Sequence, residues 1–317
     1  MTEAAGPAAT PATAPGPGPA LDRLLDKVPE LRGRREVEEL AGGLTNRNYK
    51  VVSDQGAYVV RVSPREADAL AINRENEYEN SVRAAAAGVG APVIAFLPED
   101  GITVIGFLDG ETYTDESFQA PGVIPRVAQA VRQLHGGQRF VNDFNMFEIQ
   151  RQYLTMVRHN GLRLPGGYQE FEPHVARIKA ALAVNDDGTV PCNNDLLAAN
   201  FIDDGAKIWL IDYEYAGNND ACFELGNIWS ECHLSRDQLT ELVHSYYGRP
   251  SRNKVARAQL QGLMSRYGWT LWASIQDGSS PLDFDFWSWG MQRYDNAVRV
   301  FTSPDFDQLL EEAQRPD

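Results

Sequence analysis

Three polar residues in the second half of the chain stand at intervals that suit phosphoryl transfer. Asn200 follows Asp195 by five residues, and Asp212 closes the second arm of a short apolar hairpin. Phosphoryl transfer to an alcohol needs one group that positions the hydroxyl and accepts its proton, and oxygen ligands for the magnesium ion that bridges the phosphates. We expect Asp195 to take the first role, and Asn200 and Asp212 the second. The alternative is an ordinary loop and hairpin, because Asn and Asp are common in turns.

The elements that must position these residues fall into two parts, of which the first favours strands. Between about Arg35 and Leu108, β-rich apolar runs predict strands at 49–53, 57–62, 93–97 and 102–108. The first two runs are joined by Asp54-Gln55-Gly56, which is typical of a hairpin turn. A helix is predicted over 67–87, ending at Gly88. This order describes a small antiparallel sheet that carries one helix.

Beyond Gly110 the apolar residues recur at steps of three and four, which is typical of helices. The predicted helices contain Ile124–Leu134, Met146–Val157, Val175–Leu182 and Leu260–Leu271, and they are interrupted by the hairpin region 190–212. We therefore predict an α+β protein with a β lobe at 21–109 and a larger, mainly helical lobe at 110–317. Residues 1–20, dominated by Ala, Pro, Gly and Thr, are predicted to be a disordered tail.

Composition narrows the kinds of partner. A net charge of -15 and a pI near 4.8 argue against nucleic acid or an anionic membrane surface, and suit a small cation better. Cys192, Cys222 and Cys232 lack the spacing of metal ligands, so we expect reduced thiols and a cytoplasmic protein. The sequence contains no apolar run long enough to span a bilayer. Oligomeric state is left open.

A family resemblance adds to this pattern. The stretches 192–201 (CNNDLLAANF) and 209–214 (WLIDYE) resemble the catalytic and metal motifs of the choline/ethanolamine kinases, a branch of the aminoglycoside phosphotransferase superfamily. The resemblance extends from about Gly42 to Tyr294. It implies a two-lobed, protein kinase-like fold, with ATP and magnesium as cofactors. It also implies Asp195 as the catalytic base and Asn200 and Asp212 as the metal ligands.

One residue departs from the family pattern. The family usually has His at the position of Asn193, where that His supports the loop. Asn can both donate and accept hydrogen bonds, so we expect activity to be retained. The alternative is a catalytically weak protein that binds choline or nucleotide.

The resemblance also assigns a nucleotide-binding side. A glycine-rich turn at 42–49 is similar to the family's phosphate-binding loop, which implies Thr45 and Asn46 as phosphate contacts, although these residues alone fit a plain β-turn equally well. Arg61 stands where the family keeps a phosphate-binding cation. The connector at 106–109, including Phe107, is expected to offer backbone groups to adenine.

A helix acid should hold Arg61 in place. Glu77 is our choice, because together with Asn80 it fits the family's Glu-x-x-Asn pattern. Glu75 and Glu79 are the alternatives, and on the residues alone each of the three equally fits a solvated helix face.

Several tryptophans toward the end of the sequence bear on which molecule accepts the phosphoryl group. Trp269 and Trp272 are three residues apart and share a face of the predicted helix, a pattern that on its own favours core packing. However, the run 267–272 resembles the choline kinase segment that supplies two tryptophans to a cage around the quaternary ammonium, and 286–294 resembles the helix that supplies a third aromatic ring, here Trp289. Aromatic faces bind such a cation well because it cannot donate hydrogen bonds.

Two carboxylates complete the expected acceptor site. Glu231 matches the family acid that faces the ammonium group, and Glu214 matches an acid that serves metal or substrate. A capped or ion-paired surface residue is the alternative for Glu231. The sequence thus predicts an ATP-dependent kinase that converts choline to phosphocholine. Ethanolamine or another amino alcohol is the nearest alternative acceptor, and an aminoglycoside is a more distant one.

Overall fold

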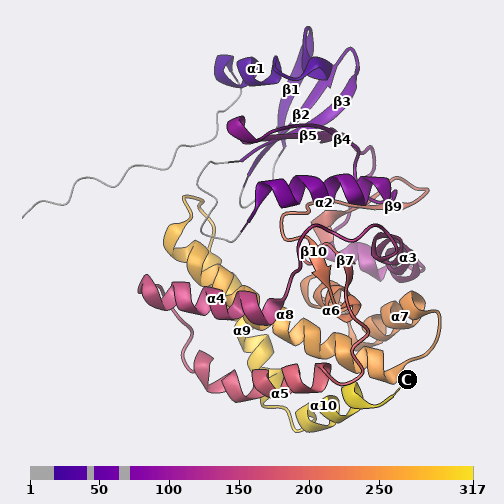
Figure 1. Cartoon of the computed structure of the whole chain (residues 1–317), viewed down its shortest axis with the longest axis vertical. Coiled ribbons are helices and arrows are strands. Elements are labelled where there is room, and N and C mark those ends of the chain that lie inside the picture. The colour runs from indigo at the N-terminus through magenta and orange to yellow at the C-terminus, as the bar shows by residue number, and fades with distance from the viewer. Residues whose placement is uncertain (1–17, 41–45, 64–71, 317) are drawn as a thin grey trace, which may run out of the picture. The chain divides into compact units, whose positions relative to one another are not determined.

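The computed structural model describes residues 18–40, 46–63 and 72–316, which form two compact units (Figure 1). The first unit comprises the described residues up to Tyr78 together with Ala91–Phe107, and the second comprises Glu79–Gly90 and the chain from Leu108 onward.

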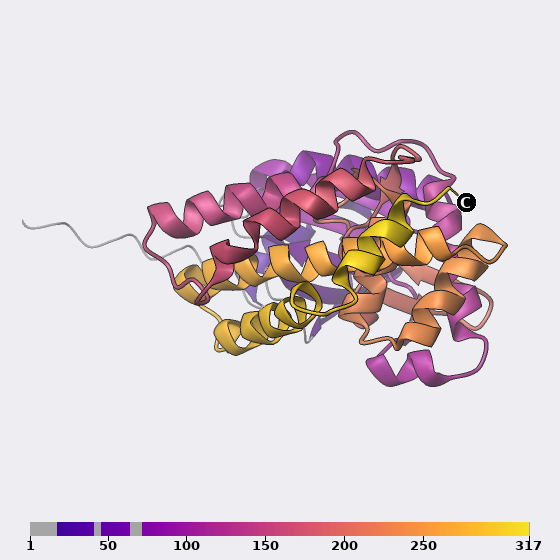
Figure 2. The same cartoon turned by 90° about the horizontal axis from the view of Figure 1, so that it is seen from below.

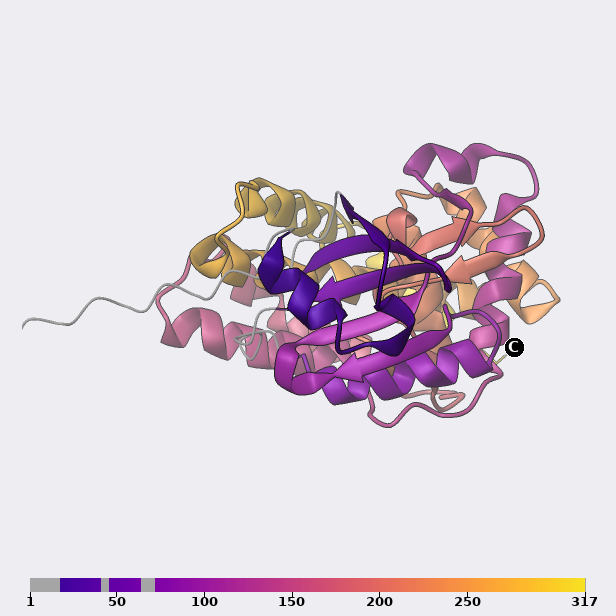
Figure 3. The ribbon, with the colours of Figure 1, turned by 90° about the horizontal axis from the view of Figure 1, so that it is seen from above.

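A five-stranded antiparallel sheet with the order β1-β2-β3-β5-β4 forms the first unit (Figure 3). Its strands are β1 (Arg35–Leu40), β2 (Arg47–Ser53), β3 (Gly56–Val62), β4 (Val93–Leu97) and β5 (Ile102–Gly106). The four predicted strands and the hairpin between Ser53 and Gly56 are confirmed. The sequence did not single out β1, because its residues are mostly charged. Such residues suit an edge strand that is largely exposed to water.

The core of this unit follows from alternation along β3. Tyr58, Val60 and Val62 are buried while the residues between them are less so, as expected for a strand with one face against a core. They pack with the buried leucines of helix α1 (Pro19–Leu25). Pro19 and Ala20, assigned by composition to the tail, therefore belong to this helix; the rest of the predicted tail, apart from Gly18, lies outside the described residues.

Helix α2 (Arg74–Ala86) begins later than the predicted residue 67. The side-chain oxygen of Asn73 accepts hydrogen bonds from the N–H groups of Glu75 and Asn76, so Asn73 caps the helix. Ile72 and Asn73 are therefore not helical, and 67–71 lie outside the described residues. Gly88, with φ of 81°, follows the helix end as predicted.

The second unit is mainly helical (Figure 2). Its helices are α3 (Val123–His135), α4 (Met146–His159), α5 (Glu172–Leu182), α6 (Ala221–Glu231), α7 (Arg236–Tyr247), α8 (Arg252–Ser279), α9 (Phe286–Phe301) and α10 (Phe306–Gln314). Short strands form two small sheets: β6 (Glu111–Thr112), β8 (Phe201–Asp203) and β9 (Ile208–Leu210) in one, and β7 (Val190–Cys192) with β10 (Gly217–Asn219) in the other. The predicted helices and the 203–205 hairpin turn are confirmed. None of the helices in the described ranges is long and apolar enough to cross a membrane.

Helix α8 is the axis of this unit, since α4, α6, α9 and α10 all contact it. Two glycines bring α6 and α8 close together: a Cβ at Gly226 would collide with the backbone at Ala258 and Gly262, and one at Gly262 would lie 2.6 Å from the Gly226 oxygen. This close approach fixes the end of α6, which carries Glu231, against the middle of α8, which carries the predicted tryptophans.

The ion pair between Asp203, at the end of β8, and Arg126 of α3 predicts a pH-dependent contribution to stability. Asp203 accepts hydrogen bonds from Arg126 at 2.5 and 2.7 Å and from the Tyr113 hydroxyl at 2.8 Å. Arg126 chiefly, with Tyr113 and the Gly205 N–H, lowers the pKa of Asp203 from 3.8 to about 2 against the opposing effect of burial. The stabilisation is thus complete above about pH 4 and is lost as the pH falls toward 2.

We expect Asp203→Asn to lower the free energy of unfolding by about 1–2 kcal/mol at pH 7, after allowance for screening of the partly exposed Arg126. The difference from wild type should vanish near pH 2. Urea denaturation of both proteins across this range measures it. Asp307→Asn is the control, because its ion pair with Arg177 is exposed and should contribute less than about 0.5 kcal/mol. A pH-independent difference for Asp203→Asn would contradict the assignment.

Candidate active site

Backbone and side-chain hydrogen bonds bring Asp195, Asn200 and Asp212 together. The Asn200 side-chain N–H donates to the Asp195 carbonyl at 2.8 Å, and the Ile211 N–H donates to the Asn200 carbonyl at 3.0 Å. Asn200 therefore lies between the loop that carries Asp195 and the strand end that carries Asp212. With its N–H₂ group turned toward Asp195, Asn200 presents its amide oxygen elsewhere. That oxygen and the Asp212 carboxylate are the hard donors that magnesium prefers, so the residues present fit the ion.

Asn193, the departure from the family pattern, is fully buried and ties the two segments together. Its N–H₂ group donates to the carbonyls of Ile211 and Asp212 at 3.0 and 2.8 Å, and its oxygen accepts the Asp195 N–H at 3.1 Å. Asp212 has a φ of 61°, an unusual value for a residue with a side chain. The bond from Asn193 to its carbonyl helps to hold that conformation, which is the supporting role expected from the sequence.

A buried carboxylate beneath the loop anchors it. Glu224, fully buried in α6, accepts the backbone N–H of Asn193 at 2.8 Å and that of Asn194 at 2.7 Å. One of its oxygens lies 3.8 Å from His135 Nε2, which is 3.5 Å from Cys192 Sγ. These three side chains form the one group of potential metal ligands found among the described His, Cys, Asp and Glu residues. Because Glu224 already accepts two loop N–H groups, the contacts assign it to support of the loop.

Asp195 is partly buried and lies within electrostatic range of other carboxylates. Burial raises the pKa of Asp195 well above its usual range, Glu231, Asp212 and Glu214 raise it further, and Arg293 opposes them. The predicted catalytic, metal and acceptor acids therefore lie within electrostatic reach of one another. A concentration of negative charge of this kind suits both a divalent cation and a cationic acceptor.

The three predicted tryptophans form one aromatic cluster with a residue that the sequence did not single out, Tyr215. Trp272 donates its indole N–H to the Tyr215 hydroxyl at 2.8 Å and lies 5.4 Å from the Trp289 ring. Tyr215 lies 4.9 Å from the Trp269 ring in an edge-on contact. Trp269 and Trp272 are both buried. The buried Trp269 N–H finds no hydrogen-bond partner in the described part of the chain.

Glu231, at the end of α6, is buried and paired. It accepts hydrogen bonds from Ser230 Oγ at 3.2 Å and from Arg293 of α9. The Arg293 guanidinium carbon also lies 3.2 Å from the centre of the Trp289 ring. The alternative of a surface residue is therefore wrong for Glu231, although the ion pair that this alternative allowed is present.

The first unit gathers its predicted nucleotide-side residues around Glu77. Arg61 and Arg74 both donate to the Glu77 carboxylate, Arg74 at 2.7 Å, and Arg74 also donates to the Asn46 side chain at 3.2 Å. Glu77 is buried, whereas the alternatives Glu75 and Glu79 are exposed. Thr45 lies outside the described residues.

The expected role of Phe107, within a connector that offers backbone groups to adenine, stays a prediction. Its N–H donates to the Ala57 carbonyl at 3.0 Å, and its ring lies 3.9 Å from Lys50 Nζ. This N–H is thus engaged within the unit.

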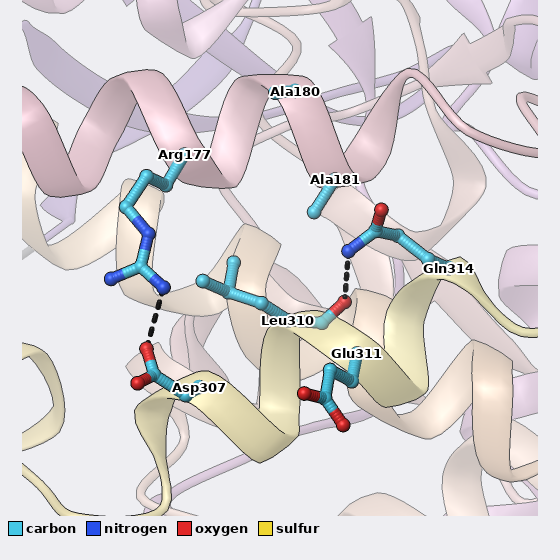
Figure 4. A pocket seen from close by; sticks show the side chains of 7 residues that line it. All are labelled: Arg177, Ala180, Ala181, Asp307, Leu310, Glu311 and Gln314. Atoms are coloured by element: carbon cyan, nitrogen blue, oxygen red, sulfur yellow. Dashed lines mark hydrogen bonds and ion pairs between the residues drawn. The ribbon is translucent and has the colours of Figure 1, made fainter.

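A pocket of about 370 Å³ lies away from these residues, between α5 and α10 (Figure 4). Arg177 and Asp307 form an ion pair at one side of it, and Gln314 donates to the Leu310 carbonyl at 2.9 Å. Its lining includes none of the predicted site residues.

The antiparallel β unit and the mainly helical unit are those of a protein kinase-like fold, which solved aminoglycoside phosphotransferases share. Residues 37–256 match the choline/ethanolamine kinase family, to which the chain belongs. It is accordingly a kinase that transfers phosphate to an alcohol.

Individual relatives agree with this assignment. A choline/ethanolamine kinase family protein from Mesorhizobium loti is 30% identical, with a TM-score of 0.82 over 93% of this chain and 98% of its own. The LicA protein of Haemophilus influenzae is 24% identical, covering 82% of this chain and 78% of the relative. Human ethanolamine kinase 2 is 25% identical, covering 86% and 79%.

Proposed function

We propose that the protein is an ATP:choline phosphotransferase that makes phosphocholine. The observation that carries the choice of acceptor is the cluster of the buried Trp269 and Trp272 with Tyr215, whose hydroxyl is within electrostatic range of the carboxylates of Glu214 and Asp195. A quaternary ammonium group cannot donate hydrogen bonds, so aromatic faces with nearby negative charge are its best environment. Relatives named for choline and for ethanolamine both match the chain, which makes the acceptor the point to test.

In this mechanism Asp195 accepts or positions the proton of the choline hydroxyl. Asn200 and Asp212 would hold magnesium, which when bound would neutralise phosphate charge and orient the phosphates for transfer. We assign Arg61, held by Glu77, to the phosphates, together with Asn46 and Thr45. ATP as donor is supported by the family and by a solved structure of LicA in complex with AMP.

The acceptor ammonium would lie against the aromatic cluster, with Glu214 and Glu231 supplying negative charge. Both acids also raise the pKa of Asp195, so an ammonium group held by them would leave the choline hydroxyl within reach of Asp195. Positioning of this kind can supply much of the catalysis of phosphoryl transfer, because the enzyme has little covalent chemistry to perform.

The experiment that tests the acceptor is Trp272→Ala, assayed by ADP release with choline and with ethanolamine. We expect kcat/KM for choline to fall roughly 10- to 30-fold, from loss of about 2 kcal/mol of cation–π attraction, and kcat/KM for ethanolamine to change much less. Trp287→Ala is the matched control, because Trp287 lies on the neighbouring helix α9 and packs under the exposed Arg163. Equal losses for both acceptors would count against the cage.

A second candidate is a weakly active protein that binds choline or nucleotide, suggested by Asn193. The hydrogen bonds of Asn193 favour a supported loop and hence the kinase. Absence of ADP release with every amino alcohol, alongside intact ATP binding by thermal shift, would favour this candidate instead.

We also propose that the protein works in the cytoplasm. Its three cysteines, Cys192, Cys222 and Cys232, are free and buried, as suits a reducing compartment.

A further inference from the structure

Arg293 lies in the acceptor region without a role assigned so far. Its guanidinium stacks on the face of Trp289, 3.2 Å from the ring centre, and donates to the Glu231 carboxylate. The side chains of Arg293 and Glu231 are 12% and 4% exposed, so the pair is shielded from water. A cation that contacts both an aromatic face and a carboxylate makes the contacts expected of a bound ammonium group.

This internal cation changes what Trp289 and Glu231 can offer. One face of Trp289 is covered by Arg293, and its ring lies 5.4 Å from that of Trp272. Trp289 is therefore better described as a support for Arg293 than as an open wall of the cage. Both oxygens of Glu231 already accept a hydrogen bond, one from Ser230 and one from Arg293.

A second arginine reinforces this effect. Arg266 of α8 donates to Ser230 Oγ at 2.9 Å, and its guanidinium carbon lies 4.4 Å from the centre of the Trp229 ring. Arg293 and Arg266 both oppose the charge of Glu231. Part of the attraction and of the hydrogen-bonding capacity of this carboxylate is therefore used within the protein, and less of it is available to an incoming cation.

We propose that Arg293 is a specificity-determining residue that disfavours primary ammonium acceptors relative to quaternary ones. The proposal rests on the proposed function as an amino-alcohol kinase, but not on which amino alcohol the wild type prefers. A primary ammonium gains most of its binding from donating to carboxylates, and with Arg293 in place it competes for Glu231 with a cation that is already bound there. A quaternary ammonium donates no hydrogen bond, so it loses less from this competition and keeps its contacts with aromatic rings.

Removal of Arg293 should reverse this bias. In Arg293→Met the stem is replaced by an apolar chain of similar reach, and Glu231 becomes a buried carboxylate in need of a cation. Ethanolamine can then donate to it directly. We expect the ratio of kcat/KM for choline to that for ethanolamine to fall roughly tenfold, mainly through a lower KM for ethanolamine, with kcat changed less.

Two further variants make the test specific. Arg293→Lys keeps the charge and can pair with Glu231, so its ratio should stay within about threefold of wild type. Arg163→Met removes an arginine stacked on Trp287 of the same helix, outside the Glu231 cluster, and should leave the ratio unchanged. Should Arg293→Met fail to fold, Arg293→Gln is read in the same way. An unchanged ratio in the uncharged variant, or equal losses for both acceptors, overturns the proposal.

Calorimetric binding of the two amines separates this inference from the proposed function. Wild-type protein that binds both amines but turns over neither would refute the kinase assignment, while the relative affinities of wild type and Arg293→Met would still judge Arg293. A shift of affinity toward ethanolamine in the variant supports its role. If neither protein binds either amine, both proposals are wrong.

Discussion

Replacement of Asp195 by Asn is expected to lower kcat by a factor of about 10²–10⁴, the usual contribution of a positioned general base. Asn keeps the shape of the side chain and can still contact the alcohol, but it cannot accept the proton. KM for ATP should change little, because Asp195 is not assigned to the nucleotide. ADP release under saturating choline and magnesium measures the effect.

Stability distinguishes this catalytic loss from misfolding. Burial and the neighbouring carboxylates of Glu231, Asp212 and Glu214 raise the pKa of Asp195, so its ionised form weakens the fold at neutral pH. The neutral Asn should therefore melt at the same or a higher temperature without magnesium. Asp237→Asn, an exposed change in the first turn of α7, is the control and should alter neither property. Retention of more than a tenth of wild-type kcat by Asp195→Asn would rule out a base at this position.

Those features of the fold that depend on local pattern were predictable from the sequence. The strands β2 and β3 alternate between buried and less buried residues, and Gly56 follows the hairpin turn, so both the strands and their register are encoded locally. The start of α2 was not found, because its apolar pattern continues upstream while the Asn73 cap decides where the helix begins. Charged β1 was missed because edge strands need no apolar face.

The candidate site likewise has some residues that the sequence predicts and others that only the structure shows. Asp195, Asn200 and Asp212 lie within one short stretch, so their spacing alone indicated that they would meet. Arg293 contacts Glu231 across 62 residues of chain, and a salt bridge between two helices leaves no periodic signal in a sequence. The predicted cage lacked Tyr215 for the same reason, since Tyr215 meets Trp272 across 57 residues of chain. Trp289 is different: Arg293, four residues later on the same helix, covers one face of its ring, and an i, i+4 contact of this kind is visible in the sequence.

The sequence does contain a signal that could have identified Glu224 as a buried anchor of the loop. It is a lone carboxylate within the apolar stretch from Cys222 to Trp229 of α6, where a charge is costly unless it is fully hydrogen-bonded. Its two bonds to the N–H groups of Asn193 and Asn194 meet that requirement. Hydrogen bonds to a charged acceptor are worth about 1.5–3 kcal/mol each, so this side chain should be among the most important for the loop.

We expect Glu224→Gln to lower the free energy of unfolding by about 2–4 kcal/mol, because the amide offers one oxygen to two N–H donors and turns an N–H₂ group toward the other. Loss of the anchor should also displace Asp195, which follows Asn194 directly. A displacement of about 1 Å can cost roughly 100-fold in rate, so we expect kcat to fall 10- to 100-fold even where the variant is fully folded. Urea denaturation and ADP release measure the two effects separately.

The matched control is Glu241→Gln, an exposed change of the same chemistry in α7, which should leave both quantities within experimental error. A Glu224→Gln protein that is destabilised but keeps wild-type kcat in its folded fraction would show that Asn193 alone positions the loop. Asn193 could act in this way because it bonds to Ile211, Asp212 and Asp195 independently of Glu224. We expect kcat to fall instead. The bonds of Asn193 join the loop only to the backbone at Ile211 and Asp212, whereas Glu224 joins it to helix α6, which packs closely on α8.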